Sequence, residues 1–346
     1  MHTYYQSKSN AAALQTSEER DTELDKSETP IQRVGLLIGE NRRDVYLKLE
    51  GYNPGGSIKH RTAFALLRQL ESTGQLRKGG RLIESSSGNL AISLAMLSRE
   101  RGYQFTAVVD PMVSEEKIQR IHDLGGEMIM VEQPDENGGY LINRLARIRE
   151  MLAEDSELLW TDQYHNPANP EAHYSGIAPE IYQQLGKKVD AVFVAVSTGG
   201  TLAGVGRYFR EKSPNTHIIA VDAKGSIALG GFPRVRKLSG IGSSRRSRFV
   251  ETGLYDELIF IEDAEAFSYC RTLEATTGIM IGGSSGACLA ACAQYLAQHK
   301  EIQRGVCICA DHGKFYASSI FSDSWLEENR LELGRQHLGL VSELTI

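Results

Sequence analysis

Short apolar runs and longer periodic runs alternate along most of the chain. In the first half, apolar runs predict strands at 45–49, 81–84, 105–109 and 128–131, each followed by a helical pattern. In the second half, strands are predicted at 191–196, 218–222, 258–261 and 306–309, with helices ending near residue 212 and spanning 264–277 and 285–297. Strands that alternate with helices of this length are typical of βαβ units. The chain is therefore predicted to be an α/β protein whose mainly parallel sheets are flanked by helices.

The length of the chain predicts two lobes rather than one. Its 346 residues exceed the size of a single domain of roughly 150 residues. Residues 1–28 carry Ser, Thr, Asp, Glu and Lys without periodicity, which favours a mobile N-terminal extension. Ligands of open α/β sheets bind beyond the carboxyl ends of the strands. We therefore expect a ligand site at the loops between the two lobes.

Composition and charge exclude two classes of partner. Charged residues make up 24% of the chain and hydrophobic residues 41%, as in ordinary soluble globular proteins. The net charge of −6 indicates no basic surface for nucleic acid. No apolar run approaches the roughly 20 residues that cross a membrane. The first 27 residues lack the apolar core of a signal peptide, so a cytoplasmic location is expected.

Five cysteines fall in the last quarter of the chain. Cys288 and Cys292 lie one helical turn apart, but no histidine is spaced with them. Cys307 and Cys309 alternate with apolar residues on a predicted strand. Because free cysteine is readily buried, all five are predicted to be packing residues, and no metal site is expected.

The segment 53–61, Asn-Pro-Gly-Gly-Ser-Ile-Lys-His-Arg, joins a predicted strand to an amphipathic helix. Its first four residues predict a tight turn, and Ser57 can cap the helix that follows. Lys59 then lies in the first helical turn, where the positive end of the helix dipole helps to lower the pKa of its amine. Lys59 is a candidate reactive amine, although the segment by itself is also typical of a solvated lysine.

A second loop is suited to phosphate. It consists of Ser197, Thr198, Gly199, Gly200 and Thr201, which follow an apolar strand and precede a helix. Hydroxyls, free backbone amides and the helix dipole then converge on one point. The loop is neither a Walker A motif nor a dinucleotide fingerprint. Taken singly, it is equally typical of a tight turn from strand to helix.

Two more loops carry serines next to glycine. The first, Ser85, Ser86, Ser87, Gly88 and Asn89, can hold a carboxylate through hydroxyls and amides, or can simply be a polar helix cap. The second, residues 282–286, contains Ser284, whose neutral hydroxyl can hydrogen-bond a heteroaromatic nitrogen without fully protonating it. An imine-forming lysine, a phosphate cup, a carboxylate loop and this hydroxyl together describe a site for pyridoxal 5′-phosphate (PLP).

Segments 53–59, 86–89, 197–201 and 283–286 resemble the four signature segments of the fold-type II PLP enzymes, the cysteine synthase and cystathionine β-synthase family. The resemblance runs from about residue 29 to 325 and implies a tryptophan synthase β-like fold. It implies a large PLP-binding domain (29–56 and 166–330), a small mobile substrate domain (57–165) and a C-terminal tail (331–346). It also implies a homodimer.

The same resemblance implies a role for each matching residue. Lys59 would form the imine with PLP and then act as the base for the substrate α-proton, while Asn89 would contact the cofactor 3′-oxygen. Residues 197–201 would bind the phosphate, Ser284 the pyridine nitrogen, and residues 85–89 the substrate carboxylate. His60 stands where many members of the family carry Asp, and three serines replace a loop that bears threonine. Both departures bear on the choice of substrate.

Segments 109–111, 132–135 with 138–141, 221–226 and 240–245 resemble the branch of the family formed by the N-(2-amino-2-carboxyethyl)-L-glutamate synthases. This branch implies a β-replacement in which phosphate leaves O-phospho-L-serine, an aminoacrylate remains, and the nitrogen of L-glutamate adds to it. The pathway implied is 2,3-diaminopropionate synthesis for the siderophore staphyloferrin B. Two anionic substrates need cations, so Arg144 and Arg245 are candidates, with Tyr164 adding a hydroxyl. Each arginine is equally typical of a solvated surface charge.

Other functions stay open at this point. A sulfhydrylase that makes cysteine from O-acetylserine or O-phosphoserine is the alternative within the family. A PLP-bound scaffold without turnover would keep Lys59 and the phosphate loop. A nucleotide-binding module without PLP would form no covalent adduct on Lys59.

Overall fold

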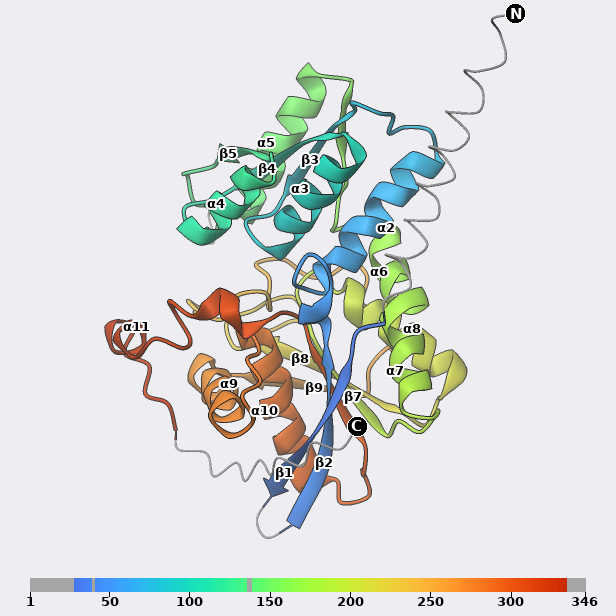
Figure 1. The fold of residues 1–346 in the computed structure, drawn as a ribbon, viewed down its shortest axis with the longest axis vertical. Coiled ribbons are helices and arrows are strands. Elements are labelled where there is room, and N and C mark those ends of the chain that lie inside the picture. Colours follow the sequence, from blue (N-terminus) through green and yellow to red (C-terminus); the bar gives the residue numbers. More distant parts are fainter. Residues whose placement is uncertain (1–27, 39–40, 136–138, 335–346) are drawn as a thin grey trace, which may run out of the picture.

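The computed structural model describes residues 28–38, 41–135 and 139–334, which form two α/β lobes (Figure 1). Nearly all of the predicted N-terminal extension, and the predicted tail from residue 335 on, lie outside the described residues. Within the described part of the chain, no helix combines the length and apolar character needed to span a membrane. The five cysteines are buried and unbridged, as predicted.

The larger lobe is built on a six-stranded sheet. From one edge to the other its strands are β1 (Ile31–Ile38), β2 (Asn41–Leu49), β10 (Gly305–Cys309), β7 (Ala191–Ala195), β8 (His217–Ala223) and β9 (Glu257–Ile261). Only the pair β1 and β2 is antiparallel among the described pairings. Side chains of β7 alternate between the two faces, since Phe193 packs in the cluster with α9 (Asp263–Thr277) and α10 (Gly283–Gln298), whereas Val192 packs with α8 (Gly200–Lys212).

The smaller lobe has a sheet of four parallel strands. Their order is β5 (Glu127–Met130), β4 (Gln104–Val109), β3 (Arg81–Ser85) and β6 (Leu158–Trp160). One face is covered by α3 (Asn89–Arg101) and α4 (Glu115–Asp123), and the other by α5 (Leu141–Glu154). The described chain therefore has the predicted class, with mainly parallel sheets flanked by helices.

Helix α2 (Lys59–Ser72) connects the lobes, and in Figure 1 it runs from the larger lobe up along the smaller one. It packs against α3 on one side and against α6 (Ala168–Ala172) on the other. Its apolar face buries Ala63, Leu66, Leu67 and Leu70, the periodic positions of the sequence. The first turn of α2 therefore lies where the two lobes meet.

The predicted strands are present with small shifts of their ends, but some elements were not predicted. Strands β1 and β6, the helix α7 (Ala178–Gln184) and a π-helical turn, η2 (His173–Ile177), are additional. Strand β6 has three residues, too few for a period to be seen. The π-helical turn lies between α6 and α7.

Candidate active site

A cavity of about 170 Å³ brings together residues of both lobes. It contains most of the residues that the sequence singled out. Its lining includes Lys59, Ser85, Ser86, Ser87, Gly88, Asn89, Lys117, Arg144, Gln163, Tyr164, Ser197, Ser284, Asp311 and Tyr316. Thr198, Gly199, Gly200, Thr201 and Arg245 are not part of this lining.

The turn before Lys59 is fixed by backbone contacts with the larger lobe. Gly56 has a φ of +77°, a conformation that side chains with a Cβ rarely adopt. The Ile58 amide donates to the carbonyl of Ala310 at 2.7 Å, just beyond strand β10. The Ser57 hydroxyl accepts a hydrogen bond from the Lys59 amide at 3.3 Å, but the N-cap position of α2 is Ile58 rather than Ser57, the residue that the sequence predicts. Lys59 is thus presented to the cavity from a rigid turn.

Desolvation lowers the pKa of the Lys59 amine to about 8, and the nearby Glu84 carboxylate partly opposes this shift. The sequence predicts a contribution from the helix dipole, whereas in the structure the main cause of the lowered pKa is burial among protein atoms. An amine with this pKa is in part unprotonated near neutral pH. Lys59 can therefore act as a nucleophile or as a base.

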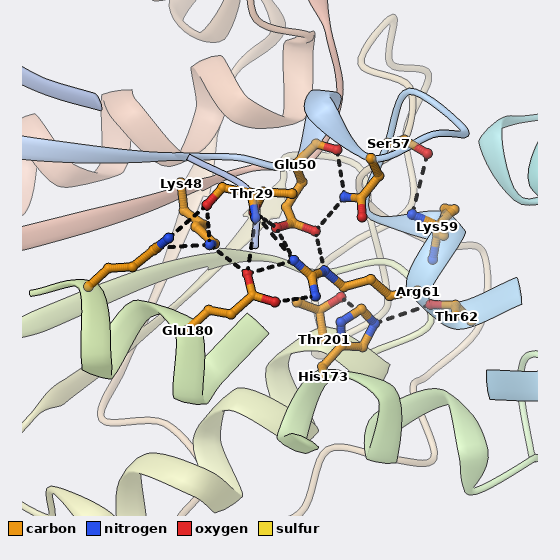
Figure 2. Close-up of polar contacts among 12 residues, drawn as sticks. Thr29, Lys48, Glu50, Ser57, Lys59, Arg61, Thr62, His173, Glu180 and Thr201 are labelled. Carbon is orange, nitrogen blue, oxygen red and sulfur yellow. Dashed lines mark hydrogen bonds and ion pairs between the residues drawn. The ribbon is translucent and has the colours of Figure 1, made fainter. Parts of the chain in front are cut away.

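Four charged side chains behind Lys59 tie α2 to the larger lobe (Figure 2). Arg61 donates from Nε to Glu50 at 2.7 Å and from Nη1 to Glu180 at 2.6 Å. Lys48, which is fully buried, donates from Nζ to Glu180 at 2.7 Å. Because the two cations are matched by two carboxylates, this ion-pair cluster (Lys48, Glu50, Arg61, Glu180) holds no unpaired charge.

The phosphate loop, residues 197–201, follows β7 and leads into α8. Gly199 has a φ of +90°, and a Cβ on Gly200 would overlap Asn169, so both positions require glycine. The loop is held by the segment that follows residue 240, because Ser247 Oγ donates to the Thr198 carbonyl at 2.7 Å. The first backbone amides of α8 have no acceptor within the helix and point out of its N-terminus.

Asn89 and Ser284 face the cavity from opposite lobes. Asn89 Nδ2 donates to Asp311 Oδ2 at 2.7 Å, and the same oxygen accepts from the Tyr316 hydroxyl at 2.6 Å. Burial raises the pKa of the Asp311 carboxyl. Ser284 lies in the first turn of α10 and is 2% exposed. These positions bring Lys59, Asn89 and Ser284 into one cavity, as the sequence analysis expects.

The three serines of the loop differ in their hydrogen-bond partners. Ser86 Oγ accepts hydrogen bonds from the amides of Gly88 and Ala91, both at 3.3 Å, and so caps the start of α3. Ser85 Oγ is buried and has no partner among the described residues. Ser87 Oγ accepts a hydrogen bond from Arg144 Nη1 at 3.2 Å. The loop therefore offers one unpaired hydroxyl and the amides at the start of α3 to a ligand.

The two candidate arginines differ in their position. Arg144 lines the cavity but pairs with Asp110 at 3.2 Å, so part of its charge is already neutralised. Arg245 lies behind Tyr164, with its guanidinium 5.3 Å from the ring centroid, and donates to His165 Nε2 at 3.2 Å. Tyr164 lines the cavity, and desolvation raises its pKa to about 12, so its hydroxyl keeps its proton.

Sequence reasoning missed Lys117, Gln163, Asp110 and Asp311. Lys117 lies on α4 and lines the cavity, and no ion pair to it is found within the described part of the chain. Asp110 comes directly after a predicted strand, and Asp311 lies two residues after the end of another. Polar residues at the carboxyl end of a parallel strand are the signal that could have found them.

The family model for pyridoxal-phosphate dependent enzymes matches residues 22–311 of the chain. The chain belongs to this family. It is a PLP-dependent, β-replacing enzyme with a fold of type II, as predicted.

Relatives of this PLP enzyme are similar over nearly their whole length. It is 39% identical over 298 residues to the N-(2-amino-2-carboxyethyl)-L-glutamate synthase of Ralstonia nicotianae, covering 86% of this chain and 88% of the relative. It is also similar to the crystal structure of an O-ureido-L-serine synthase, with a TM-score of 0.78, 30% identity and coverage of 88% and 97% of the two chains. An O-acetylserine dependent cystathionine beta-synthase from Helicobacter pylori gives a TM-score of 0.77 at 30% identity, with coverage of 85% and 96%.

The residues of this PLP enzyme fit the cofactor. A desolvated lysine amine, Lys59, lies in the same cavity as Ser284, whose neutral hydroxyl suits a ring nitrogen. The loop at 197–201 provides glycine-rich backbone and helix amides for a phosphate. Glu84 is the carboxylate whose charge acts on the Lys59 amine. Its oxygens accept hydrogen bonds from the Thr161 hydroxyl and from the amides of Ser85 and Gln163, and so they do not hold the amine.

Proposed function

We propose that the enzyme replaces the phosphate of O-phospho-L-serine with the nitrogen of L-glutamate, giving N-(2-amino-2-carboxyethyl)-L-glutamate and phosphate. The Ralstonia relative carries this synthase name. The observation that carries the proposal is the presence of two smaller-lobe cations, Lys117 and Arg144, in the lining of the same cavity as Lys59 and Ser284.

The charge of the cavity favours an anionic leaving group. A phosphate ester carries about 1.5 to 2 negative charges at neutral pH, and burying it without cations costs several kcal/mol. Lys117 provides a cation whose pKa is lowered by burial, which indicates that it gains from an anionic partner. Arg144 adds a second cation whose Nε has no partner in the described structure. An acetyl ester is neutral and would give neither cation an anionic leaving group to bind.

Lys59 would bind the cofactor through its aldehyde carbon and would transfer the α-proton of the substrate. PLP, when bound, supplies an electron sink for the charge that develops at the substrate α-carbon. Once displaced by the substrate amine, Lys59 Nζ can take the α-proton and later return it, because its pKa of about 8 is close to neutral pH.

The remaining residues would bind and orient. The Ser85 hydroxyl and the amides at the start of α3 would hold the substrate carboxylate, since they are donors next to a helix N-terminus. Ser284 would meet the ring nitrogen, Asn89 the 3′-oxygen and residues 197–201 the phosphate. Lys117 and Arg144 would hold the leaving phosphate or the carboxylates of glutamate.

The test pairs two donors with two nucleophiles. Full-length protein with PLP is given O-phosphoserine or O-acetylserine, together with L-glutamate or sulfide, and the product is identified by mass. The proposal expects the glutamate adduct and release of phosphate only from O-phosphoserine. Cysteine as the main product, from either donor, would instead support the sulfhydrylase.

We further propose that the enzyme is a homodimer and that its product feeds 2,3-diaminopropionate and siderophore synthesis. Support comes from the family resemblance, including the branch-specific segments. Sedimentation of the full-length protein tests the first point. A strain that lacks the enzyme and regains siderophore production when fed 2,3-diaminopropionate would support the second.

A further inference from the structure

Two fully buried side chains, Asn169 and His173, lie behind the phosphate loop. Asn169 belongs to α6, and His173 opens the π-helical turn η2. Figure 2 shows His173 between Thr62 of α2 and Thr201 of the loop. The pair therefore joins the helix that carries Lys59 to the loop that would hold the phosphate.

Asn169 fixes the direction of the Thr198 hydroxyl. Its Nδ2 donates to the Gln163 carbonyl at 2.7 Å and to Thr198 Oγ1 at 3.2 Å. Thr198 Oγ1 also accepts from the Gly200 amide at 3.4 Å. A hydroxyl has two lone pairs and one proton. Because both lone pairs are used, the Thr198 proton is left for another acceptor.

His173 fixes the direction of the Thr201 hydroxyl in a similar way, and the effect depends on which ring nitrogen of His173 carries the proton. Thr62 Oγ1 donates its proton to Asn169 Oδ1 at 3.4 Å. Thr62 Oγ1 also lies 3.2 Å from His173 Nε2, and because its proton is already used, it accepts a hydrogen bond from this nitrogen. The proton is therefore on Nε2, which also lies 3.3 Å from Thr201 Oγ1. The other tautomer would bury an N–H at Nδ1, where no partner exists among the described residues, and an unpaired buried donor is costly.

His173 is also kept neutral by its surroundings. Burial, together with the positive charges of Lys59 and Arg61, keeps the pKa of His173 well below its ordinary value. A neutral ring with its proton on Nε2 donates to threonine oxygens and accepts nothing from them. The hydroxyl protons of Thr198 and Thr201 have no acceptor within residues 28–38, 41–135 and 139–334.

We propose that Asn169 and His173 are positioning residues that make the hydroxyls of Thr198 and Thr201 hydrogen-bond donors to the 5′-phosphate of PLP. This inference rests on the proposed placement of the cofactor phosphate at residues 197–201. A phosphate dianion has acceptors and no proton, so a loop that offers only donors selects it. Asn169 and His173 act through the threonines and do not touch the cofactor themselves.

The test compares PLP with pyridoxal, which lacks the phosphate but can form the same link to Lys59. Full-length protein is stripped of cofactor and titrated with each compound, and the absorbance change gives two dissociation constants. The phosphate preference is the constant for pyridoxal divided by that for PLP. Thr198→Val should lower this preference about tenfold. Asn169→Asp should lower it at least as much, because its carboxylate accepts the Thr198 proton.

The double variant separates hydroxyl direction from added charge. In the Thr198→Val background, Asn169→Asp should have little further effect, because no hydroxyl remains to be turned. An equal loss in both backgrounds would show that the new charge alone is responsible and would overturn the proposal. A loss with Thr198→Val but none with Asn169→Asp would overturn the role of Asn169 and leave the phosphate site intact. No loss with Thr198→Val would overturn the phosphate placement itself.

Variants of His173 provide an independent test if the Asn169→Asp protein does not fold. His173→Gln keeps an N–H donor and should keep the phosphate preference within about twofold, whereas His173→Leu should lower it about tenfold. Pyridoxal binding and the midpoint of thermal unfolding are measured for both variants as controls for a purely structural effect. Equal phosphate preferences for the two variants would overturn the role of His173.

Discussion

On the larger-lobe side of the cavity, the ion-pair cluster of four charged side chains holds the first turn of α2. On the smaller-lobe side, the ion pair found next to the serine loop among the described residues is that between Arg144 and Asp110. The charges around Arg61 are all matched. In contrast, Ser85 Oγ and Arg144 Nε of the smaller lobe are buried without a partner in the described structure, and so is Asp311 Oδ1 on the larger-lobe side of the cavity.

From this difference we expect the ion-pair cluster to fix Lys59 and the residues near the serine loop to meet the substrate. A buried polar group without a partner costs free energy, and a ligand can recover it. The matched cluster gains nothing from a ligand and serves to fix Lys59. We therefore expect substitutions on the first side to change stability or chemistry, and substitutions on the second side to change substrate binding.

The largest effect is expected for Lys59→Ala. Removing a general base commonly lowers a rate by about 10²- to 10⁴-fold, and here the covalent attachment point of PLP is lost as well. Phosphate release from O-phosphoserine measures the rate, and borohydride reduction followed by mass analysis measures the attachment. A variant that keeps a reducible adduct would show that another amine holds the cofactor. Lys188→Ala, which removes an exposed lysine, serves as the matched control.

The second prediction concerns the ion-pair cluster. Arg61→Met leaves Glu50 and Glu180 short of their cation in a buried site, which typically costs about 3 to 5 kcal/mol of unfolding free energy. The control is Arg207→Met, which breaks an exposed pair with Glu171 and should cost about 0 to 1 kcal/mol. Denaturant unfolding measures both. Equal costs would mean that the cluster does not fix α2 in the way inferred.

The third prediction addresses the substrate side. Lys117→Met and Arg144→Ala should each raise the Michaelis constant for O-phosphoserine about tenfold, because each removes a cation from an anion site, while PLP stays bound. The Arg144 variant also leaves Asp110 without its partner, so its effect should be the larger one. Lys117→Arg, which keeps the charge, is the control. An unchanged Michaelis constant in either variant would remove that residue from the substrate site.

The smallest effect is a pH dependence on the cofactor side. The pKa of Lys59 is lowered to about 8, so the reactive unprotonated amine is scarce below pH 8 and dominant above it. The rate at which PLP rejoins the stripped protein should therefore rise about fivefold from pH 7 to pH 8 and then level off. Stopped-flow absorbance measures the rate. A rate that keeps rising past pH 9 would indicate an ordinary lysine.

The lowered pKa of Lys59 also makes the stability of the cofactor-free protein depend on pH. Because the pKa of Lys59 is lower in the folded protein than in the unfolded chain, the unfolded chain binds more protons between about pH 8 and the ordinary value of 10.5. The contribution of Lys59 to the stability of the cofactor-free protein is unfavourable below pH 8 and is relieved as the pH rises through this window.

The sequence by itself determined the fold class, the family and the local frame of the site. Strands and helices follow from periodicity, and the turns around Gly56 and Gly199 follow from glycine at positions with positive φ. These features depend on residues close together in the chain. Lys59, Asn89 and Ser284 could therefore be chosen before their common cavity was known.

Only the tertiary structure decided which polar atoms meet. Arg61 and Glu180 are 119 positions apart, and Thr62 and His173 are 111 apart. No local pattern reveals such pairs, because they arise when separate helices pack. For the same reason, the main cause of the lowered pKa of Lys59 is burial, a property that the surrounding elements create together.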